Sequence, residues 1–172
     1  CEIWVPTQFP EVVRDKAAKI TGLEPEQVTV HTTYLGGGFG RRGWDFAVQA
    51  IQASKAVGRP VKLIWTREED TQHDFYRPAY KSRLQVQLDE DGLPKFWSHQ
   101  LAGPSAISEL TWQLVDTRAV GKLLNWIDWD VTSTEGTQLP YAIPDHEIDY
   151  EVIEPGIRVG FWRSVGCLLY TS

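Results

Sequence analysis

One glycine-rich stretch organises this sequence, and it reads Gly36-Gly37-Gly38-Phe39-Gly40-Arg41-Arg42-Gly43. Glycine lacks a Cβ and adopts positive φ angles that other residues avoid, so this density of glycine predicts a special loop rather than a helix or a strand. The backbone N–H groups of such a loop can point outward, and the positive end of a following helix can add to them. We therefore expect residues 36–43, the glycine loop, to bind an anion such as a phosphate or an oxo group.

The residues on both sides of the glycine loop predict a strand before it and a helix after it. Residues 28–34 alternate and are rich in β-branched side chains, which is typical of a strand. Residues 44–57 place small and apolar side chains at helical spacing, and Gly58 is a typical helix stop. The glycine loop is therefore expected at a strand-to-helix junction.

The rest of the first half predicts three more elements. Residues 2–5 indicate a short strand, and residues 11–21 indicate a helix that ends at Gly22. Residues 61–65 form an apolar run typical of a buried strand, and a polar turn is expected to begin at residues 67–70. Together with the glycine loop, these elements predict a βαβαβ segment.

The second half of the chain predicts antiparallel strands. Residues 80–88 and 94–101 both alternate, and residues 89–92 between them are typical of a turn, so they predict a hairpin. Residues 147–152 and 157–163 indicate two further strands. The predicted fold class is mixed α/β: a βαβαβ segment with a glycine loop, followed by antiparallel strands.

Composition argues against several classes of protein. The 172 residues have a net charge of −6 and no basic cluster that could follow a phosphate backbone, so nucleic acid is not expected as a partner. No apolar run approaches the roughly 18 residues of a membrane-spanning helix, so no membrane insertion is expected. Cys1 and Cys167 lie at opposite ends and the four histidines are scattered, so no set of protein metal ligands is predicted.

The glycine loop on its own leaves other interpretations open. Residues 38–43 fit the G-x-G-x-x-G pattern of an NAD(P)-type dinucleotide-binding domain. The available acidic residue is Glu68 or Glu69, and Glu68 follows at 68 − 38 = 30 positions, later than the usual separation of about 20. A phosphate-binding P-loop is excluded, because no Lys-Ser or Lys-Thr follows at the required place. The glycines could also serve only a tight turn in a non-catalytic α/β interaction module.

Four ordered motifs resemble the xanthine dehydrogenase/aldehyde oxidase family of molybdenum hydroxylases. The glycine loop resembles the signature loop of that family, and residues 4–8 resemble its strand that ends in Thr-Gln, with Gln8 and Phe39 separated by 39 − 8 = 31 positions as in the family. Residues 65–78 resemble its R-x-E-D … R-H-P segment, and residues 160–166 resemble its F-R-G-x-G segment. The Arg-Arg pair of the loop and the spelling of residues 161–166 resemble the isoquinoline 1-oxidoreductase β-subunit branch.

The resemblance implies roles for individual residues. Gln8 corresponds to a glutamine whose side-chain amide hydrogen-bonds an oxygen ligand of molybdenum. The resemblance places the molybdopterin cofactor against residues of the loop (Gly37, Gly38, Phe39 and Gly40), with Arg163 flanking the pterin. Arg77 falls where the family can place a substrate-orienting arginine; the alternative for Arg77 is a surface ion pair with Asp70 or Asp74, and for Gln8 it is a helix-start residue.

The resemblance also implies what surrounds this chain. Residues 1–166 are expected to be an internal part of the molybdopterin-binding large subunit, and residues 167–172, which depart from the family pattern, a non-native tail. The implied cofactor is molybdopterin in its cytosine dinucleotide form, with iron–sulfur clusters in a small partner subunit. The implied reaction hydroxylates an N-heteroaromatic or aldehyde carbon with oxygen from water. Gly43 stands where the purine-oxidising branch has a glutamate, which argues against purine substrates. The family's general base lies beyond this chain, so these 172 residues alone are expected to be inactive.

Overall fold

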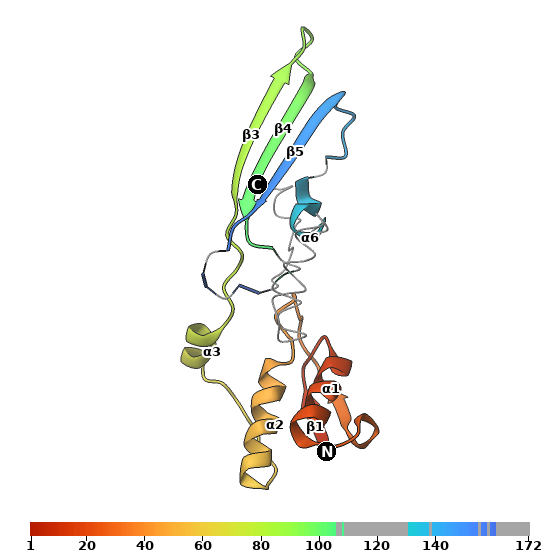
Figure 1. The fold of residues 1–172 in the computed structure, drawn as a ribbon, viewed down its shortest axis with the longest axis vertical. Helices are drawn as coiled ribbons and strands as arrows, with labels where there is room; N and C mark the ends of the chain where they lie inside the picture. Colours follow the sequence, from red (N-terminus) through yellow and green to blue (C-terminus); the bar gives the residue numbers. More distant parts are fainter. Residues whose placement is uncertain (106–107, 109–130, 138, 155, 158, 161–172) are drawn as a thin grey trace. The chain divides into compact units, whose positions relative to one another are not determined.

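The computed structural model describes residues 1–105, 108, 131–137, 139–154, 156–157 and 159–160. The chain divides into two compact units, Cys1–Asp74 and Phe75–Ser172 (Figure 1). The described part of the first unit has a two-stranded sheet with helices, and that of the second has a three-stranded sheet. The predicted mixed α/β class is confirmed.

The first unit opens with a β-α-β arrangement. Strand β1 (Glu2–Val5) pairs in parallel with β2 (Thr29–Thr32), and helix α1 (Pro10–Thr21) and the 3-10 helix η1 (Pro25–Gln27) lie between them in sequence. Alternate residues of β1, Ile3 and Val5, are buried, and so is the apolar face of α1. Helix α1 ends where the sequence predicted, because Gly22 adopts the left-handed conformation with φ 80°.

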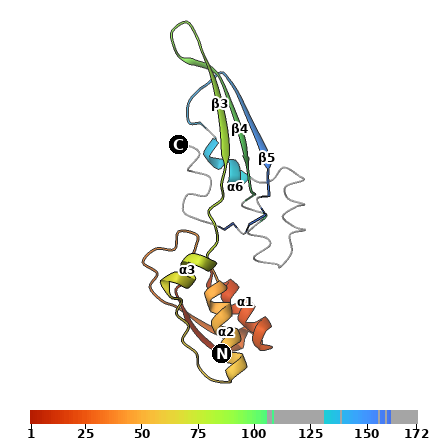
Figure 2. The ribbon, with the colours of Figure 1, turned by 90° about the vertical axis from the view of Figure 1, so that its left-hand side faces the viewer.

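Helix α2 (Asp45–Val57) follows the glycine loop and packs against α1, as Figure 2 shows. Its buried residues are the small or branched Ala47 and Ile51, which allow the two helices to approach closely. Gly58 ends the helix with φ 64°, in agreement with the sequence prediction. The glycine loop is thus bounded by β2 on one side and α2 on the other.

The prediction of a third strand in the βαβαβ segment is wrong. Residues 61–65 form no strand, and their larger apolar side chains are exposed: Val61 (37%), Leu63 (39%) and Ile64 (72%). Trp65 instead contacts α2, where its ring packs edge-on against Phe46 and its Nε1 donates to Oε1 of Gln49 at 2.9 Å. An apolar run becomes a strand only when another strand edge accepts its hydrogen bonds. In the described part of the unit, β2 pairs with β1 alone.

The polar stretch after this run is a helix rather than a turn. Helix α3 (Arg67–His73) begins after Thr66, whose Oγ1 accepts a hydrogen bond from the backbone N–H of Glu69 at 3.3 Å. Three acidic residues occupy its first turn, where they interact favourably with the positive end of the helix. These are N-terminal signals of a helix, and they favour a helix over the expected turn.

The second unit contains the predicted hairpin. Strands β3 (Lys81–Leu88) and β4 (Pro94–Gly103) pair antiparallel, with Leu84 opposite His99 and an irregularity between Gln87 and Leu88. The turn is closed by Asp89, whose carboxylate accepts hydrogen bonds from the backbone N–H groups of Asp91 and Leu93. Such a local polar turn between alternating runs explains why this hairpin could be predicted.

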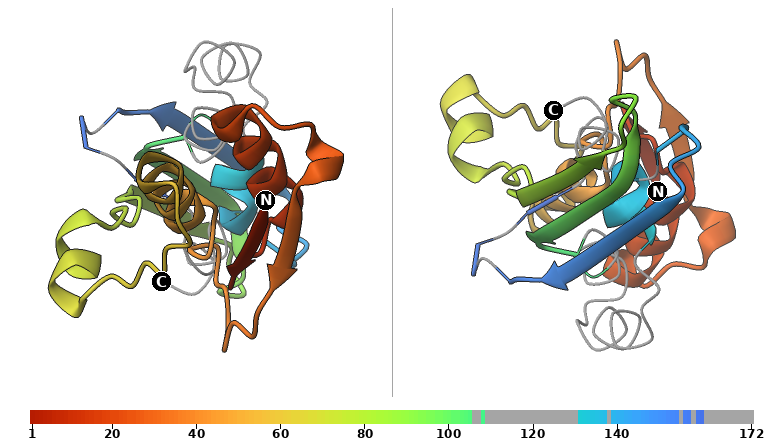
Figure 3. Two further views of the ribbon diagram at one scale, coloured as in Figure 1. Left: turned by 90° about the horizontal axis from the view of Figure 1, so that it is seen from below. Right: turned by 90° about the horizontal axis from the view of Figure 1, so that it is seen from above.

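Strand β5 (Asp145–Val152) pairs parallel to β4, so the antiparallel orientation predicted for it is wrong. The sheet has the order β3-β4-β5, and Figure 3 shows its twist from both ends. Helix α6 (Val131–Thr134) and the 3-10 helix η2 (Glu135–Thr137) precede β5. Of the strand expected at residues 157–163, the described residues show only an isolated bridge between Tyr76 and Val159, and residues 161–163 lie outside the described part.

Candidate functional site

Gln8 lies against the glycine loop. Its Oε1 accepts a hydrogen bond from the backbone N–H of Gly40 at 3.0 Å, and its own backbone N–H donates to the carbonyl oxygen of Arg42 at 2.8 Å. The alternative that Gln8 serves as the start of α1 is not supported, because the N-cap position is Phe9 and has no side-chain cap. Gln8, which follows strand β1, therefore lies against the loop and contacts Gly40, 32 residues away in sequence.

Two glycines of the loop leave no room for a side chain. A Cβ at Gly38 would lie 2.2 Å from Cδ of Gln8, and a Cβ at Gly37 would lie 2.4 Å from the ring of Phe39. Gly37 also has φ 111°, which L residues rarely adopt. The glycines thus allow Gln8 and the ring of Phe39 to pack directly onto the loop backbone.

Phe39 has the only positive φ of any non-glycine residue in the described part of the chain, at 53°. A left-handed conformation costs a side-chain-bearing residue roughly 1–2 kcal/mol. Phe39 is also 56% exposed. A residue held in a strained conformation with an exposed aromatic ring is a pattern found at ligand sites.

The loop presents a set of hydrogen-bond donors. Within the described part of the chain, no hydrogen bond uses the backbone N–H of Gly36, Gly37 or Gly38, or Nε2 of Gln8. Because Oε1 of Gln8 accepts from Gly40, the atom left to face a ligand is the donor Nε2. These donors suit a ligand that is rich in acceptors, such as oxo groups, sulfur or phosphate.

Thr7 secures the base of the loop, and sequence reasoning did not identify this role. Its side chain is buried, Oγ1 donates to the carbonyl oxygen of Gly43 at 2.7 Å, and it accepts from the backbone N–H of Phe9 at 3.0 Å. The signal for it was the alternation of buried residues Ile3, Val5 and Thr7, which carries a polar side chain into the core.

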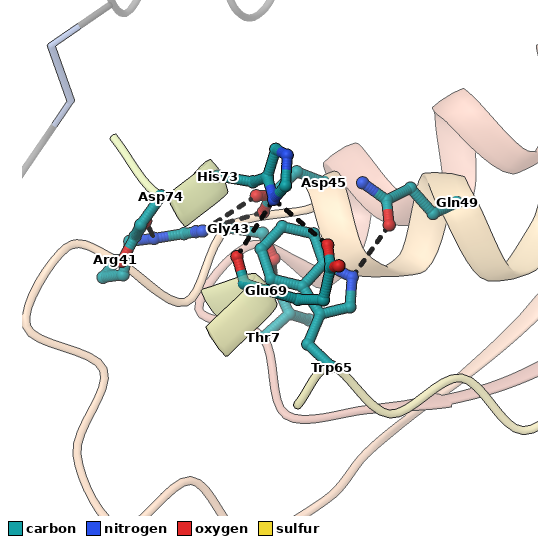
Figure 4. A network of polar contacts seen from close by, with 9 residues as sticks. All are labelled: Thr7, Arg41, Gly43, Asp45, Gln49, Trp65, Glu69, His73 and Asp74. Atoms are coloured by element: carbon teal, nitrogen blue, oxygen red, sulfur yellow. Dashed lines mark hydrogen bonds and ion pairs between the residues drawn. The ribbon is translucent and has the colours of Figure 1, made fainter. Parts of the chain in front are cut away.

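Arg41 ties the loop to its surroundings (Figure 4). Its guanidinium group donates to both carboxylate oxygens of Asp45, at 3.2 and 3.1 Å, and to the carboxylate of Asp74. Its carbon Cζ also lies 4.6 Å from the centre of the Phe46 ring. The positive end of α2 therefore faces the chain's own Asp45 in its first turn, and the expectation that it would add to anion binding is not supported.

The remaining predicted site residues lie elsewhere. Arg77 is an exposed residue of the second unit, and Arg163 lies outside the described residues. The carboxylates considered as partners of Arg77 pair with other arginines, Asp70 with Arg67 at 3.0 Å and Asp74 with Arg41. The structure thus brings together Gln8, Gly37, Gly38, Phe39 and Gly40, while the roles of Arg77 and Arg163 stay predictions.

Two further kinds of feature are absent from the described residues. No group of three or more histidine, cysteine, aspartate or glutamate side chains in this part of the chain could hold a metal ion. No helix there has the length and apolar character needed to cross a membrane.

Comparison with known proteins shows the family of the chain. The sequence model of the molybdopterin cofactor-binding domain matches residues 1–144, which include β1, Gln8 and the glycine loop. This chain belongs to the molybdopterin cofactor-binding domain family. The resemblance derived from the ordered motifs is confirmed.

Relatives of this molybdopterin cofactor-binding domain are subunits of oxidoreductases. The chain is 32% identical over 167 residues to the isoquinoline 1-oxidoreductase subunit beta of Brevundimonas diminuta. The matched region covers 96% of this chain and 20% of that protein. It is 31% identical over 100 residues to the aldehyde oxidoreductase molybdenum-binding subunit of Escherichia coli (strain K12), over 57% of this chain and 14% of that protein. The chain thus spans about a fifth or less of the length of these relatives.

A solved structure shares the fold of this molybdopterin cofactor-binding domain. Quinoline 2-oxidoreductase from Pseudomonas putida 86 superposes with a TM-score of 0.62 at 19% identity, over 95% of this chain and 20% of that one. At this identity the comparison supports the fold alone.

Proposed function

We propose that this chain is part of the large subunit of a molybdenum hydroxylase and that its glycine loop holds the molybdopterin cofactor. The complete enzyme would hydroxylate a carbon of an N-heteroaromatic compound or an aldehyde, with water as the source of oxygen. Family membership supports the cofactor, and the names of the relatives support the class of reaction. The observation that carries the proposal is the hydrogen bond from Gly40 to Gln8, which turns the donor Nε2 of Gln8 away from the loop backbone.

The donor set of the loop fits this cofactor. Molybdopterin offers oxygen and sulfur acceptors around the metal and a phosphate on the pterin side. The loop offers the N–H groups of Gly36, Gly37 and Gly38, and Gln8 adds its side-chain Nε2, with no protein acceptor for these four donors in the described residues. The protein metal ligands that the sequence lacked are not needed, because a pterin dithiolene holds this metal itself.

The cofactor, when bound, supplies the redox chemistry of the hydroxylation, and the chain's residues bind and orient. Nε2 of Gln8 is proposed to donate to an oxygen ligand of the metal, and its preorganisation by Gly40 makes that donor effective. The exposed ring of Phe39 is proposed to cover the cofactor and exclude water on that side. Arg163 is proposed to flank the pterin, and Arg77 to orient the substrate.

The surroundings of this domain are also part of the proposal. Residues 1–166 would be one portion of the large subunit, and residues 167–172 a non-native tail. The cofactor would have the cytosine dinucleotide form, and a small partner subunit would hold the iron–sulfur clusters. A cysteine-rich reading frame next to that of the large subunit would support this partner, and DNA sequencing on both sides would find it.

The dinucleotide-binding alternative has less support from the fold. That class places its acidic residue at the end of the strand after the glycine-rich helix. Residues 61–65 form no strand here, and Glu68 lies in the first turn of α3. The interaction-module alternative does not explain why Phe39 is held in a left-handed conformation beside unused donors.

Turnover in isotopically labelled water tests the proposed reaction. The complete purified enzyme would be given isoquinoline, benzaldehyde or xanthine with an artificial electron acceptor. We expect an N-heteroaromatic compound or an aldehyde to be oxidised with oxygen from the labelled water, and xanthine to be left unchanged because Gly43 replaces the purine-branch glutamate. Product oxygen derived from molecular oxygen would contradict the proposal.

A further inference from the structure

Arg41 is the most extensively bound charged side chain of the glycine loop. Only 10% of its side chain is exposed, and the two carboxylates that it contacts are also largely covered, with Asp45 at 26% and Asp74 at 19%. The contacts with Asp45 are bidentate, which fixes the orientation of the planar guanidinium group. The ring of Phe46 covers one of its faces.

The backbone of Arg41 is itself part of the loop. Its N–H donates to the carbonyl oxygen of Gly38 at 3.0 Å, and its carbonyl oxygen accepts from the N–H of Gly43 at 2.9 Å. Arg41 directly follows Gly40, whose N–H is held by Gln8. The contacts of the Arg41 side chain are therefore attached directly to the backbone segment that carries Phe39 and Gly40.

The neighbouring Arg42 does not share this arrangement. It is exposed, and within the described residues it forms no ion pair; its Cζ lies 5.8 Å from the centre of the Phe46 ring. Two adjacent arginines thus have different surroundings, and only Arg41 connects the loop to α2 and to Asp74, the residue that follows α3.

We propose that Arg41 is the positioning residue of the cofactor loop. Its guanidinium group, held between Asp45 and Asp74, fixes the loop in the conformation that presents Phe39, Gly40 and the amide of Gln8 to the cofactor. The cofactor half of this inference rests on the proposed function; the loop-holding half does not. Lysine cannot replace this arginine, because a single ammonium group cannot bind Asp45 with two parallel hydrogen bonds and reach Asp74 as well.

The test uses the complete purified protein in four forms: wild type, Arg41→Lys, Asp74→Asn and the control Arg14→Lys. Arg14 forms an exposed ion pair with Asp15 on α1, so this control makes the same substitution away from the loop. Two quantities are measured in each form. Hydrogen–deuterium exchange of peptides that cover residues 36–44 reports on the loop without requiring cofactor, and the molybdenum content after extensive dialysis reports on cofactor retention.

We expect Arg41→Lys and Asp74→Asn to exchange the loop amides faster than wild type and to retain less molybdenum after dialysis, in line with an affinity for the cofactor that is about 10- to 100-fold lower. Arg14→Lys should match wild type in both measurements. Unchanged exchange in Arg41→Lys would overturn the inference, and faster exchange with unchanged molybdenum retention would overturn its cofactor half. If wild type itself contained no molybdenum, the proposed function would fail, whereas the exchange data would still decide whether Arg41 holds the loop.

Discussion

Oε1 of Gln8 accepts a hydrogen bond of 3.0 Å from the backbone N–H of Gly40, across 32 residues of sequence. The bond fixes which end of the Gln8 amide faces the loop, because a backbone N–H requires an acceptor. Nε2 is then the atom available to a ligand. This hydrogen bond joins the end of strand β1 to the glycine loop.

The substitution Gln8→Glu should impair the function of the cofactor site without destabilising the fold. A glutamate keeps the acceptor for Gly40 but replaces the donor Nε2 by a negatively charged oxygen, which would repel the oxygen ligands of the cofactor. We expect kcat to fall by about 10²–10³-fold, as for the loss of one preorganised donor, with little change in the thermal midpoint. The control is Gln49→Glu, because Gln49 also uses its Oε1 as an acceptor, from Trp65. Equal effects of the two substitutions would contradict the role of Gln8.

Gly38→Ala should disturb the site through packing. The new Cβ would lie 2.2 Å from Cδ of Gln8 and 2.3 Å from its Oε1, so Gln8 or the loop must move. We expect a loss of about 1–3 kcal/mol in the free energy of unfolding, measured by urea denaturation, together with a lower molybdenum content. Gly43→Ala is the matched control, because its Cβ would meet only Oδ1 of Asp45 at an ordinary 3.7 Å. If both variants were equally stable, the packing argument would be wrong.

Two substitutions of Phe39 distinguish the cost of its left-handed backbone from the contribution of its ring. Phe39→Gly and Phe39→Ala both remove the ring and differ only in the Cβ, which is unfavourable at φ 53°. We expect the glycine variant to be more stable than the alanine variant by about 1 kcal/mol, because only glycine adopts this conformation without cost. Both should retain molybdenum less well than wild type. An alanine variant as stable as the glycine variant would show that residue 39 is not held at positive φ.

His99 predicts a pH dependence of stability. His99 is 3% exposed, its Nε2 has no hydrogen-bond partner among the described residues, and burial lowers its pKa below the ordinary 6.5. Below pH 6.5, His99 is therefore protonated in the unfolded chain but remains neutral in the folded chain. The free energy of unfolding falls as the pH drops from 6.5 toward the folded-state pKa.

The slope of this decline is at most about 1.4 kcal/mol per pH unit. Urea unfolding between pH 5 and 8 would measure it, and we expect a constant contribution above the window. His99→Leu suits the site, because Leu84 and Ile148 lie opposite residue 99 in the sheet. This variant should lose the His99 part of the slope, and a slope identical to that of wild type would refute the assignment.

Local signals explain the elements that the sequence predicted. Gly22 and Gly58 end α1 and α2 in left-handed conformations, and Asp89 closes the turn of the hairpin with its own carboxylate. Each of these depends on residues within a few positions of one another. Gln8 and the glycine loop were placed together only by resemblance to a family, since nothing local links them.

Long-range partners explain what the sequence did not predict. The run at residues 61–65 has strand composition but has no strand partner within the described part of the chain, and the sequence pattern did not indicate that β5 pairs parallel to β4. Asp74 binds Arg41 from 33 residues away, a contact that the sequence did not predict. The choice among several nearby carboxylates is a property of the folded chain rather than of its sequence pattern.

The molybdenum content of the complete purified protein tests the central claim most directly. The protein would be expressed with its partner subunit in a host that makes the cofactor, and molybdenum and released pterin would be measured for wild type and Gly38→Ala. We predict near-stoichiometric molybdenum with pterin in wild type and a marked loss in Gly38→Ala. A folded wild-type protein without molybdenum or pterin would contradict the account.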